Sequence, residues 1–164
     1  MRGKMPTKDP YQQLDDTARG LIRELMDEAT HAALAVLRPS TALPSVSRIA
    51  LAIDAKGQPI SLISSLSDHS LALQNNPACA LLIGDPGPKG DPLTHPRLTL
   101  RAMARLVARG TEDHDNLRQR YLSLRPKAKL YADFADFSFV RFEIEDGLLN
   151  GGFGKAYRID ATDI

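Results

Sequence analysis

Two stretches of the chain alternate apolar and polar residues with a period of two. The first, "RLTLRAMARLV", begins at Arg97, and the second, "FSFVRFEIE", begins at Phe137. The residues predicted to face the core are Leu98, Leu100, Ala102 and Ala104 in the first stretch, and Val140, Phe142 and Ile144 in the second. Because successive side chains of a strand point to opposite faces, this pattern predicts strands with one buried face. Such strands are typical of an antiparallel sheet.

Further strand and helix signals surround these two stretches. Strands are predicted at "HAALAVL", "PSVSRIALAI", "ISLIS", "ACALLIG" and "GLLNGGFGKAYRI". Helices are predicted from Tyr11 to about Ala29 after a cap at Asp9, over a short segment ending at Asn75, and within "TEDHDNLRQRYLSLRP", with one more turn at "KAKLY". The turn "DAKGQP" joins the second and third strands in a hairpin. This order predicts a mainly β protein with helices, an antiparallel, Greek-key-like barrel decorated by short helices.

The composition narrows the class of protein. A length of 164 residues suits one domain, which we expect at 11–164 after a flexible N-terminus at 1–10. Lys and Arg number 21 against 20 Asp and Glu, so the net charge of +1 favours neither nucleic acid nor an anionic membrane as a partner. The first residues lack the apolar stretch of a signal peptide, and no run is long enough to cross a membrane, which predicts a cytoplasmic protein.

The segment "SSLSDHSLALQNNP" crowds hydroxyl groups before a predicted helix. Backbone N–H groups at a helix start attract phosphate when hydroxyls and cations complete the shell. The candidate phosphate ligands are Ser64, Ser65, His69 and Ser70. The other interpretation is that Ser67 or Asp68 caps the helix and the remaining polar groups face water. The residues of this segment leave both interpretations open.

Other positions also have two interpretations. Ser47 and Arg48 are neighbours on opposite faces of a strand, and Arg48 either reaches solvent or pairs with an anion. Arg97 presents the same choice beside the loop 84–96, whose prolines and glycines exclude regular structure and which is either a lid over a cleft or a surface insertion. The glycines around Phe153 either admit a flat ligand or form a bulged strand end.

Metal and hydrolase chemistry find little support in the sequence. The four histidines, His31, His69, His95 and His114, are scattered without ligand spacing, so no metal site is predicted. A Gly-X-Ser-X-Gly elbow is missing from the sequence, which argues against a serine hydrolase. Cys79 lies in an apolar strand, where a buried thiol is expected rather than a nucleophile. No catalytic residue is assigned.

The order of the segments from about Gly20 onward carries a resemblance. It consists of "HAALAVL", "LPSVSRIAL", "ISLISSLSDHSLALQNNPACALL", "PRLTLRAMARLV" and "YADFADFSFVRFEIEDGLLNGGFGKAY", of which the last is the most specific. Together these segments resemble the pyridoxamine-5′-phosphate-oxidase-like flavoproteins, and among them the haem-utilisation subgroup. The resemblance implies a split β-barrel homodimer that holds FMN in clefts between the subunits.

The resemblance also implies a set of cofactor-binding residues. These are Ser47 and Arg48 on the second strand, Ser64 or Ser65 as the strand-end hydroxyl, His69 and Ser70 beside the phosphate, Arg97 near the flavin, and Phe153 and Lys155 in a closing motif that reaches the cofactor or the neighbouring subunit. Two features depart from the family pattern. Leu71 and Ala72 replace a polar Arg-Asn pair, which weakens the expected binding of FMN, and no histidine follows Gly154, where haem-degrading relatives carry an iron ligand.

The function that the resemblance implies is an FMN-binding oxidoreductase acting on a small-molecule substrate, in which the flavin supplies the chemistry. Two alternatives share the fold. One is a haem-binding or haem-degrading protein, and the other is a flavin-binding module without enzymatic activity.

Overall fold

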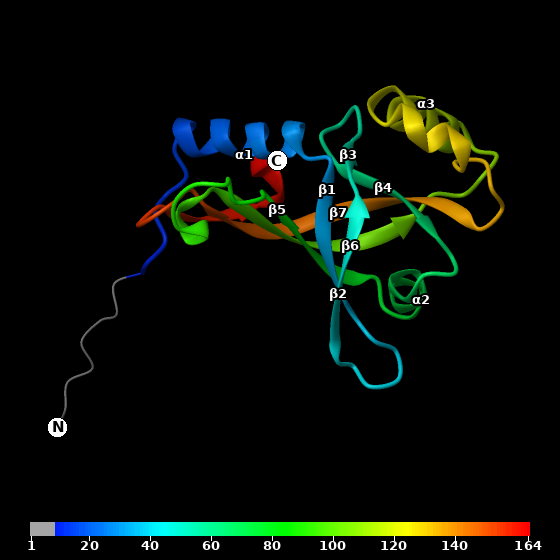
Figure 1. Ribbon diagram of the computed structural model, residues 1–164, viewed down its shortest axis with the longest axis horizontal. Helices are drawn as coiled ribbons and strands as arrows, with labels where there is room; N and C mark the ends of the chain where they lie inside the picture. The colour runs from blue at the N-terminus through cyan, green and yellow to red at the C-terminus, as the bar shows by residue number, and fades with distance from the viewer. Residues whose placement is uncertain (1–8) are drawn as a thin grey trace.

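A curved antiparallel sheet forms the framework of the computed structural model, which describes residues 9–164 (Figure 1). Its strands follow the order β2-β1-β5-β6-β7-β4-β3, and β8 pairs with β7. The strands are β1 (His31–Leu37), β2 (Pro44–Ala50), β3 (Ala52–Ile53), β4 (Pro59–Ser64), β5 (Ala78–Ile83), β6 (Arg97–Leu106), β7 (Phe137–Asn150) and β8 (Ala156–Asp160). All these pairings are antiparallel. The mainly β fold predicted from the alternation is confirmed.

Helices connect and cover the strands. They are α1 (Asp16–Glu28), α2 (Asp68–Asn75) and α3 (Glu112–Leu124), with the 3₁₀ turns η1 (Pro92–Thr94), η2 (Pro126–Leu130) and η3 (Ala161–Asp163). The predicted start of the first helix at Tyr11 is wrong. Asp15 caps α1 instead, because its carboxylate accepts the N–H of Ala18 at 2.8 Å. The preceding residue Gln12 is held beside β8 by its N–H, which donates to the carbonyl of Ala156 at 2.8 Å.

Two predicted strands are divided in the structure. The stretch "GLLNGGFGKAYRI" is the end of β7, a turn at 151–155 and β8, since Gly151 N–H bonds to the carbonyl of Lys155 and closes the turn. The stretch "PSVSRIALAI" is divided at Leu51 into β2 and β3. The loop 84–96 also contains the turn η1, which the sequence did not predict. The expected N-terminal segment 1–10 falls mostly outside the described residues.

The bend at Leu51 closes the sheet on itself. β2 pairs with β1 at one end of the strand order, and β3 pairs with β4 at the other. Leu51 between them is fully buried, and its N–H donates to the carbonyl of Thr30 at 2.9 Å. Its carbonyl accepts from Arg125 Nε at 2.9 Å, and the same guanidinium donates to the carbonyl of Ala29 at 2.6 Å. Arg125 therefore links the end of α1, the bend at Leu51 and the end of α3 to one another by hydrogen bonds.

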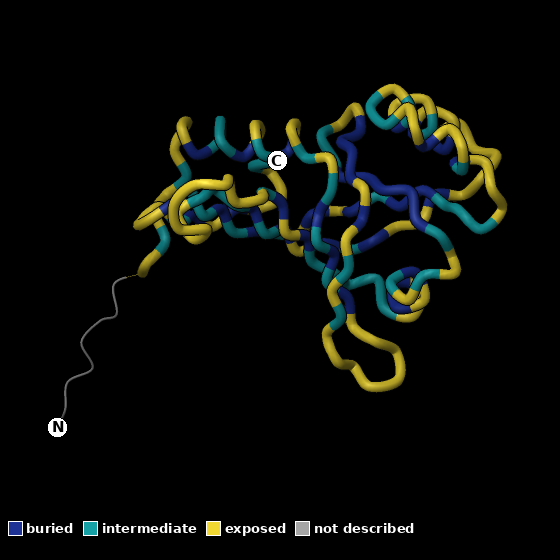
Figure 2. Tube along the Cα trace, viewed as in Figure 1, coloured by how far each residue is buried: buried dark blue, intermediate teal, exposed yellow. Residues whose placement is uncertain are grey.

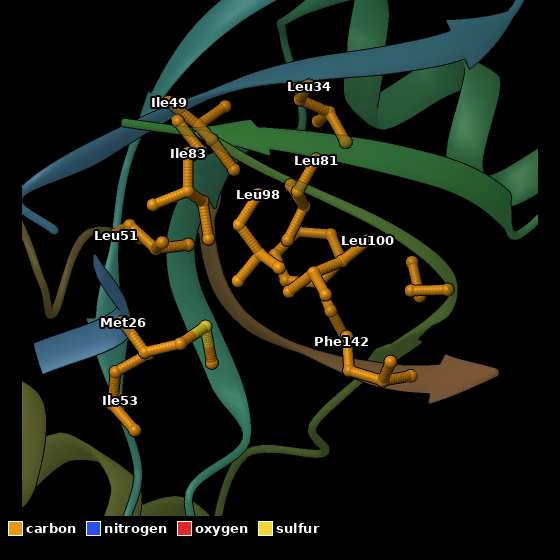
Figure 3. Close-up of a cluster of buried hydrophobic side chains, with 14 of the residues drawn as sticks. Met26, Leu34, Ile49, Leu51, Ile53, Leu81, Ile83, Leu98, Leu100 and Phe142 are labelled. Atoms are coloured by element: carbon orange, nitrogen blue, oxygen red, sulfur yellow. The ribbon is translucent and has the colours of Figure 1, made fainter. Parts of the chain in front are cut away.

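The buried hydrophobic residues form two core clusters. Figure 2 marks the buried positions along the chain. The larger core packs α1 and α2 onto the face that carries Leu34, Leu81 and Leu100, which we call the inner face (Figure 3). The smaller core lies under α3 and η2, where the Tyr121 and Phe139 rings meet edge to face with centroids 5.4 Å apart. The opposite side of β1, β5 and β6, which carries Ala33, Leu82 and Thr99, is called the outer face.

Within residues 9–164, none of the helices combines the length and the apolar character that a membrane crossing requires.

Replacing Arg125 by Ala tests the role of this guanidinium. We expect the free energy of unfolding to fall by about 2–4 kcal/mol, because the carbonyls of Leu51, Ala29 and Leu124 lose a charged donor in a partly buried site. Urea denaturation followed by circular dichroism measures the change. The matched control is Arg23→Ala on the exposed side of α1, which should change stability by less than about 0.5 kcal/mol. Equal stability of the two variants would contradict the assigned role.

Candidate functional site

Ser67 caps α2, as the capping interpretation predicted, but Ser64 and Ser70 bond inside the protein instead of facing water. Its hydroxyl accepts the N–H of Ser70 at 3.4 Å and donates to the carbonyl of Ser64 at 2.7 Å. The hydroxyl of Ser70 is buried and lies 2.8 Å from that of Ser67. The hydroxyls of Ser67 and Ser70 are therefore engaged within the helix start and are not directed to a ligand.

Ser64 is also engaged inside the protein. Its hydroxyl donates to Asp136 Oδ2 at 2.8 Å and accepts the N–H of Leu66 at 3.2 Å. The neighbouring Ser65 N–H donates to the backbone carbonyl of Asp136 at 2.7 Å, while the Ser65 side chain is exposed. The sequence analysis missed Asp136, although the repeated "ADF" in "YADFADF" marked this segment. Through Asp136, this motif links the loop after β4 to the start of β7 by hydrogen bonds.

Ser47 and His69 are the two predicted residues that the fold brings into contact. Ser47 Oγ on β2 lies 3.0 Å from His69 Nδ1 in the first turn of α2. The imidazole is half-buried, and burial lowers its pKa below the ordinary value of 6.5, although the charge of Asp68 opposes the shift. His69 is therefore neutral at pH 7, with one nitrogen oriented by a hydroxyl.

The two predicted arginines lie on the outer face, away from this pair. Arg48 is opposite Ala33 in the register of β1 and β2, whereas Ser47 is opposite the inner-face residue Leu34. Arg97 begins β6 and donates through one terminal nitrogen to the carbonyl of Leu93 at 3.0 Å. Three strand spacings of about 4.8 Å separate β2 from β6. One chain therefore does not gather Ser47, Arg48 and Arg97 into a single shell.

Arg97 borders a small cavity of about 240 Å³. Tyr11, Thr99 and Asn150 line it together with apolar side chains of β7 and the start of β8. The adjacent loop 84–96 is organised by His95, whose Nε2 lies 2.8 Å from the carbonyl of Lys89 and whose Nδ1 accepts the N–H of Gly87 at 3.2 Å. The hydrogen bonds of His95 therefore hold the loop in a defined conformation beside Arg97. Its role as a lid stays a prediction.

Phe153 and Lys155 belong to the turn between β7 and β8. Phe153 is 95% exposed, and Lys155 is exposed as well. Figure 1 shows this turn, in orange and red, at the left end of the sheet, while α2 lies at the lower right. The positive φ of Gly152 (113°) and of Gly154 (73°) explains why glycines occupy the turn. Within one chain these two residues do not approach Ser47 and His69.

A cavity of about 680 Å³ lies elsewhere, between α3 and the β3–β4 turn. Its floor is an ion-pair network. Buried Asp54 accepts from Arg141 Nε at 3.0 Å, and the terminal nitrogens of Arg141 donate to Asp113 at 2.8 and 3.1 Å. Because these charged groups satisfy one another, we assign this cavity a structural role.

Comparison with known proteins places this geometry in a family. The family model described as CREG, beta-barrel matches residues 15–163. The chain belongs to the CREG β-barrel family. The fold is shared more widely, because a protein related to general stress protein 26, of the pyridoxinephosphate oxidase family, from Clostridium acetobutylicum superposes with a TM-score of 0.67 at 13% identity, over 90% of this chain and 96% of that chain. The predicted split-barrel fold is thereby confirmed.

Two further relatives of this CREG β-barrel chain carry haem in their names. The non-canonical heme oxygenase HOZ, chloroplastic, from Arabidopsis thaliana is 44% identical over 101 residues, which are 61% of this chain and 29% of that protein. A heme binding protein from Mycobacterium smegmatis superposes with a TM-score of 0.81 at 23% identity, over 92% of this chain and 60% of that chain. The chain thus spans less than a third of the Arabidopsis protein and about 60% of the mycobacterial one.

The depressed pKa of His69 predicts how stability depends on pH. Because the unfolded imidazole binds a proton near pH 6.5 and the folded one only at lower pH, the folded state should lose stability as the pH falls below 6.5. We expect His69→Gln to lose less stability than the unmodified protein between pH 7 and pH 5, as measured by urea denaturation. An NMR titration of the His69 ring should give a midpoint below 6.5. A midpoint above 6.5 would contradict the burial of this ring.

Proposed function

We propose that this protein of the CREG β-barrel family binds haem. The observation that carries the proposal is the 44% identity, over 101 residues, to a chloroplast haem oxygenase. The chain also superposes on a heme binding protein with a TM-score of 0.81, which supports haem binding as a function of this fold. Bound haem supplies a redox-active iron whose reactivity depends on its axial ligand and on the polarity around it.

The residues of the chain suit a flat apolar macrocycle that carries carboxylates. The outer face leaves Val46 67% exposed and Leu82 44% exposed, with small alanines between them in the register. Arg97 borders the cavity at the edge of this face and can pair with a carboxylate through the guanidinium nitrogens that the carbonyl of Leu93 leaves free. Apolar surface next to a cation is what a haem with ionised propionates requires.

FMN is the second candidate ligand, with an oxidoreductase as the corresponding function. The contact between Ser47 and His69 favours it, because both residues were predicted at the phosphate. Against it, the hydroxyls of Ser64 and Ser70 already bond within the protein, and Leu71 and Ala72 offer no charged donor. Fewer hydrogen-bond donors therefore remain free for a phosphate group than the sequence predicted.

Parallel titrations of the purified chain with haemin and with FMN separate the two ligands. We expect a saturable Soret band on adding haemin, and a dissociation constant for haemin far below that for FMN. Quenching of FMN fluorescence measures the second equilibrium. Tight FMN binding without a saturable Soret band would reverse the order of the two candidates. Serum albumin is the control for non-specific uptake of haemin by an apolar surface.

The haem-binding form is proposed to be a homodimer that pairs through the outer face. α1 and α2 contribute buried residues to the inner core, and the outer face retains exposed apolar side chains that a second copy would bury. Replacing Leu82 by Glu should shift the protein from dimer to monomer in sedimentation velocity at micromolar concentration, because the new carboxylate would be desolvated at the contact. Leu93→Glu, at an exposed position in the 84–96 loop, is the matched control. A monomeric unmodified protein would contradict the proposal.

A further inference from the structure

The cavity of about 240 Å³ beside Arg97 lies on the outer face of the sheet. In the strand register, Arg97 is opposite Asn150 on β7, and Asn150 is opposite Ala156 on β8. Thr99, two positions after Arg97 on β6, is opposite Leu148. Paired residues of neighbouring strands, and alternate residues of one strand, point to the same side of a sheet. The cavity therefore belongs to the face that the proposed function assigns to haem.

Arg97 is a cation without a carboxylate partner in the part of the chain that the structure describes. It is half-buried, and among residues 9–164 no Asp or Glu lines its cavity. Other arginines of β6 and β8 are paired, in Arg101–Asp146, Arg105–Glu143 and Arg158–Asp9. A partly buried charge that the protein does not neutralise favours an anionic ligand.

The hydrogen bonds of Arg97 leave one edge of its guanidinium available. The terminal nitrogen Nη1 donates to the carbonyl of Leu93 at 3.0 Å and to that of His95 at 3.4 Å. These bonds hold the side chain, whereas its Nε and Nη2 have no acceptor within residues 9–164. The N–H groups of Nε and Nη2 are parallel, and their spacing matches the two oxygens of a carboxylate.

Tyr11 closes the cavity from the segment before α1. The guanidinium carbon of Arg158 lies over the Tyr11 ring, 4.0 Å from its centroid. The N–H of Tyr11 donates to Asp9 Oδ1 at 3.1 Å, and the N–H of the next residue, Gln12, donates to the carbonyl of Ala156 at 2.8 Å. This wall is therefore in place before a ligand arrives, which lowers the free-energy cost of binding.

The size and the lining of the cavity select the ligand group. Pockets that enclose a complete drug-sized ligand measure roughly 300–1,000 Å³, so a cavity of about 240 Å³ takes one arm of a larger molecule. Leu148 and Ala156 supply an apolar wall for an alkyl chain. The amide oxygen of Asn150 accepts the N–H of Gly152 at 3.2 Å, which leaves the amide nitrogen as a donor. A short alkyl chain that ends in a carboxylate matches this lining better than a phosphate on a polar chain.

We infer that this cavity binds one carboxylate arm of the haem, with Arg97 as the bidentate partner and Tyr11 as the closing wall. The inference rests on the proposed haem-binding function and names a site within it. The apolar body of the macrocycle then lies along the outer face toward Leu82, which is opposite Thr99 on β5. Because the cavity admits one arm and leaves the second carboxylate outside, the site also sets the orientation of the ring.

The unmodified protein is titrated with haemin and with haemin dimethyl ester, which keeps the macrocycle and loses the carboxylate charges. We expect the dissociation constant of the ester to be at least roughly tenfold higher, because the charge-assisted bonds to Arg97 are lost. In Arg97→Gln the preference for haemin over the ester should disappear. Arg97→Lys should show an intermediate preference, because an ammonium lacks the planar fork. Arg105→Gln, a paired arginine on the same strand, is the matched control and should keep the preference.

Sodium propionate tests the cavity without haem. In an NMR titration, the Nε–H resonance of Arg97 should shift and saturate as propionate is added. Tyr11→Ala should weaken this response, because it removes one wall of the cavity. A tighter response to inorganic phosphate than to propionate would assign the cavity to phosphate and overturn the carboxylate assignment.

The two titrations separate the failure of the site from the failure of the function. Equal affinity of the unmodified protein for haemin and for its ester, or a preference that persists in Arg97→Gln, would overturn the site and leave haem binding intact. A saturable propionate response without haemin binding would overturn the proposed function and leave a carboxylate site. The absence of both responses would overturn both.

Discussion

The chain closes its sheet by bending one strand at Leu51, and within residues 9–164 no ladder of hydrogen bonds joins the two ends of the strand order. Such a bend interrupts the pairing, so buried backbone groups at the corner need other partners. Arg125 supplies them, because a guanidinium presents five donors in a rigid fork. It donates to the carbonyls of Leu51 at the bend, Ala29 at the end of α1 and Leu124 at the end of α3. The relative positions of α1, α3 and the barrel depend on this one group.

The same closure positions the candidate site. β2 is held in register by β1, with Ser47 opposite Leu34, and α2 is anchored in the inner core by Ala72 and Leu73. Ser47 and His69 therefore meet because a strand and a helix are each fixed by packing, and not because their hydrogen bond draws them together. A polar pair supported in this way keeps its geometry when a ligand is absent, which lowers the cost of ordering it on binding.

The fold followed from the sequence because its signals are local. The alternation in β6 and β7 and the turn "DAKGQP" report on residues a few positions apart, and the structure has them as predicted. The candidate site could be predicted from the sequence only in part. Ser64 is bonded to Asp136, which is 72 positions away, and this contact removes a hydroxyl that local composition assigned to phosphate. Asp15 rather than Asp9 caps α1, because Gln12 is bonded to a strand 144 positions later in the chain.

β8 forms one of the free edges of the sheet. β8 pairs with β7 on one side only, and an uncovered strand edge invites pairing with another molecule. Gln12 occupies that edge with a single parallel bridge to Tyr157, and its amide nitrogen donates to the carbonyl of Gly154 at 2.7 Å. The extended segment before α1 thus covers this edge of β8 at Tyr157. Its bonds to β8 take up backbone groups that a strand of another molecule would need for pairing.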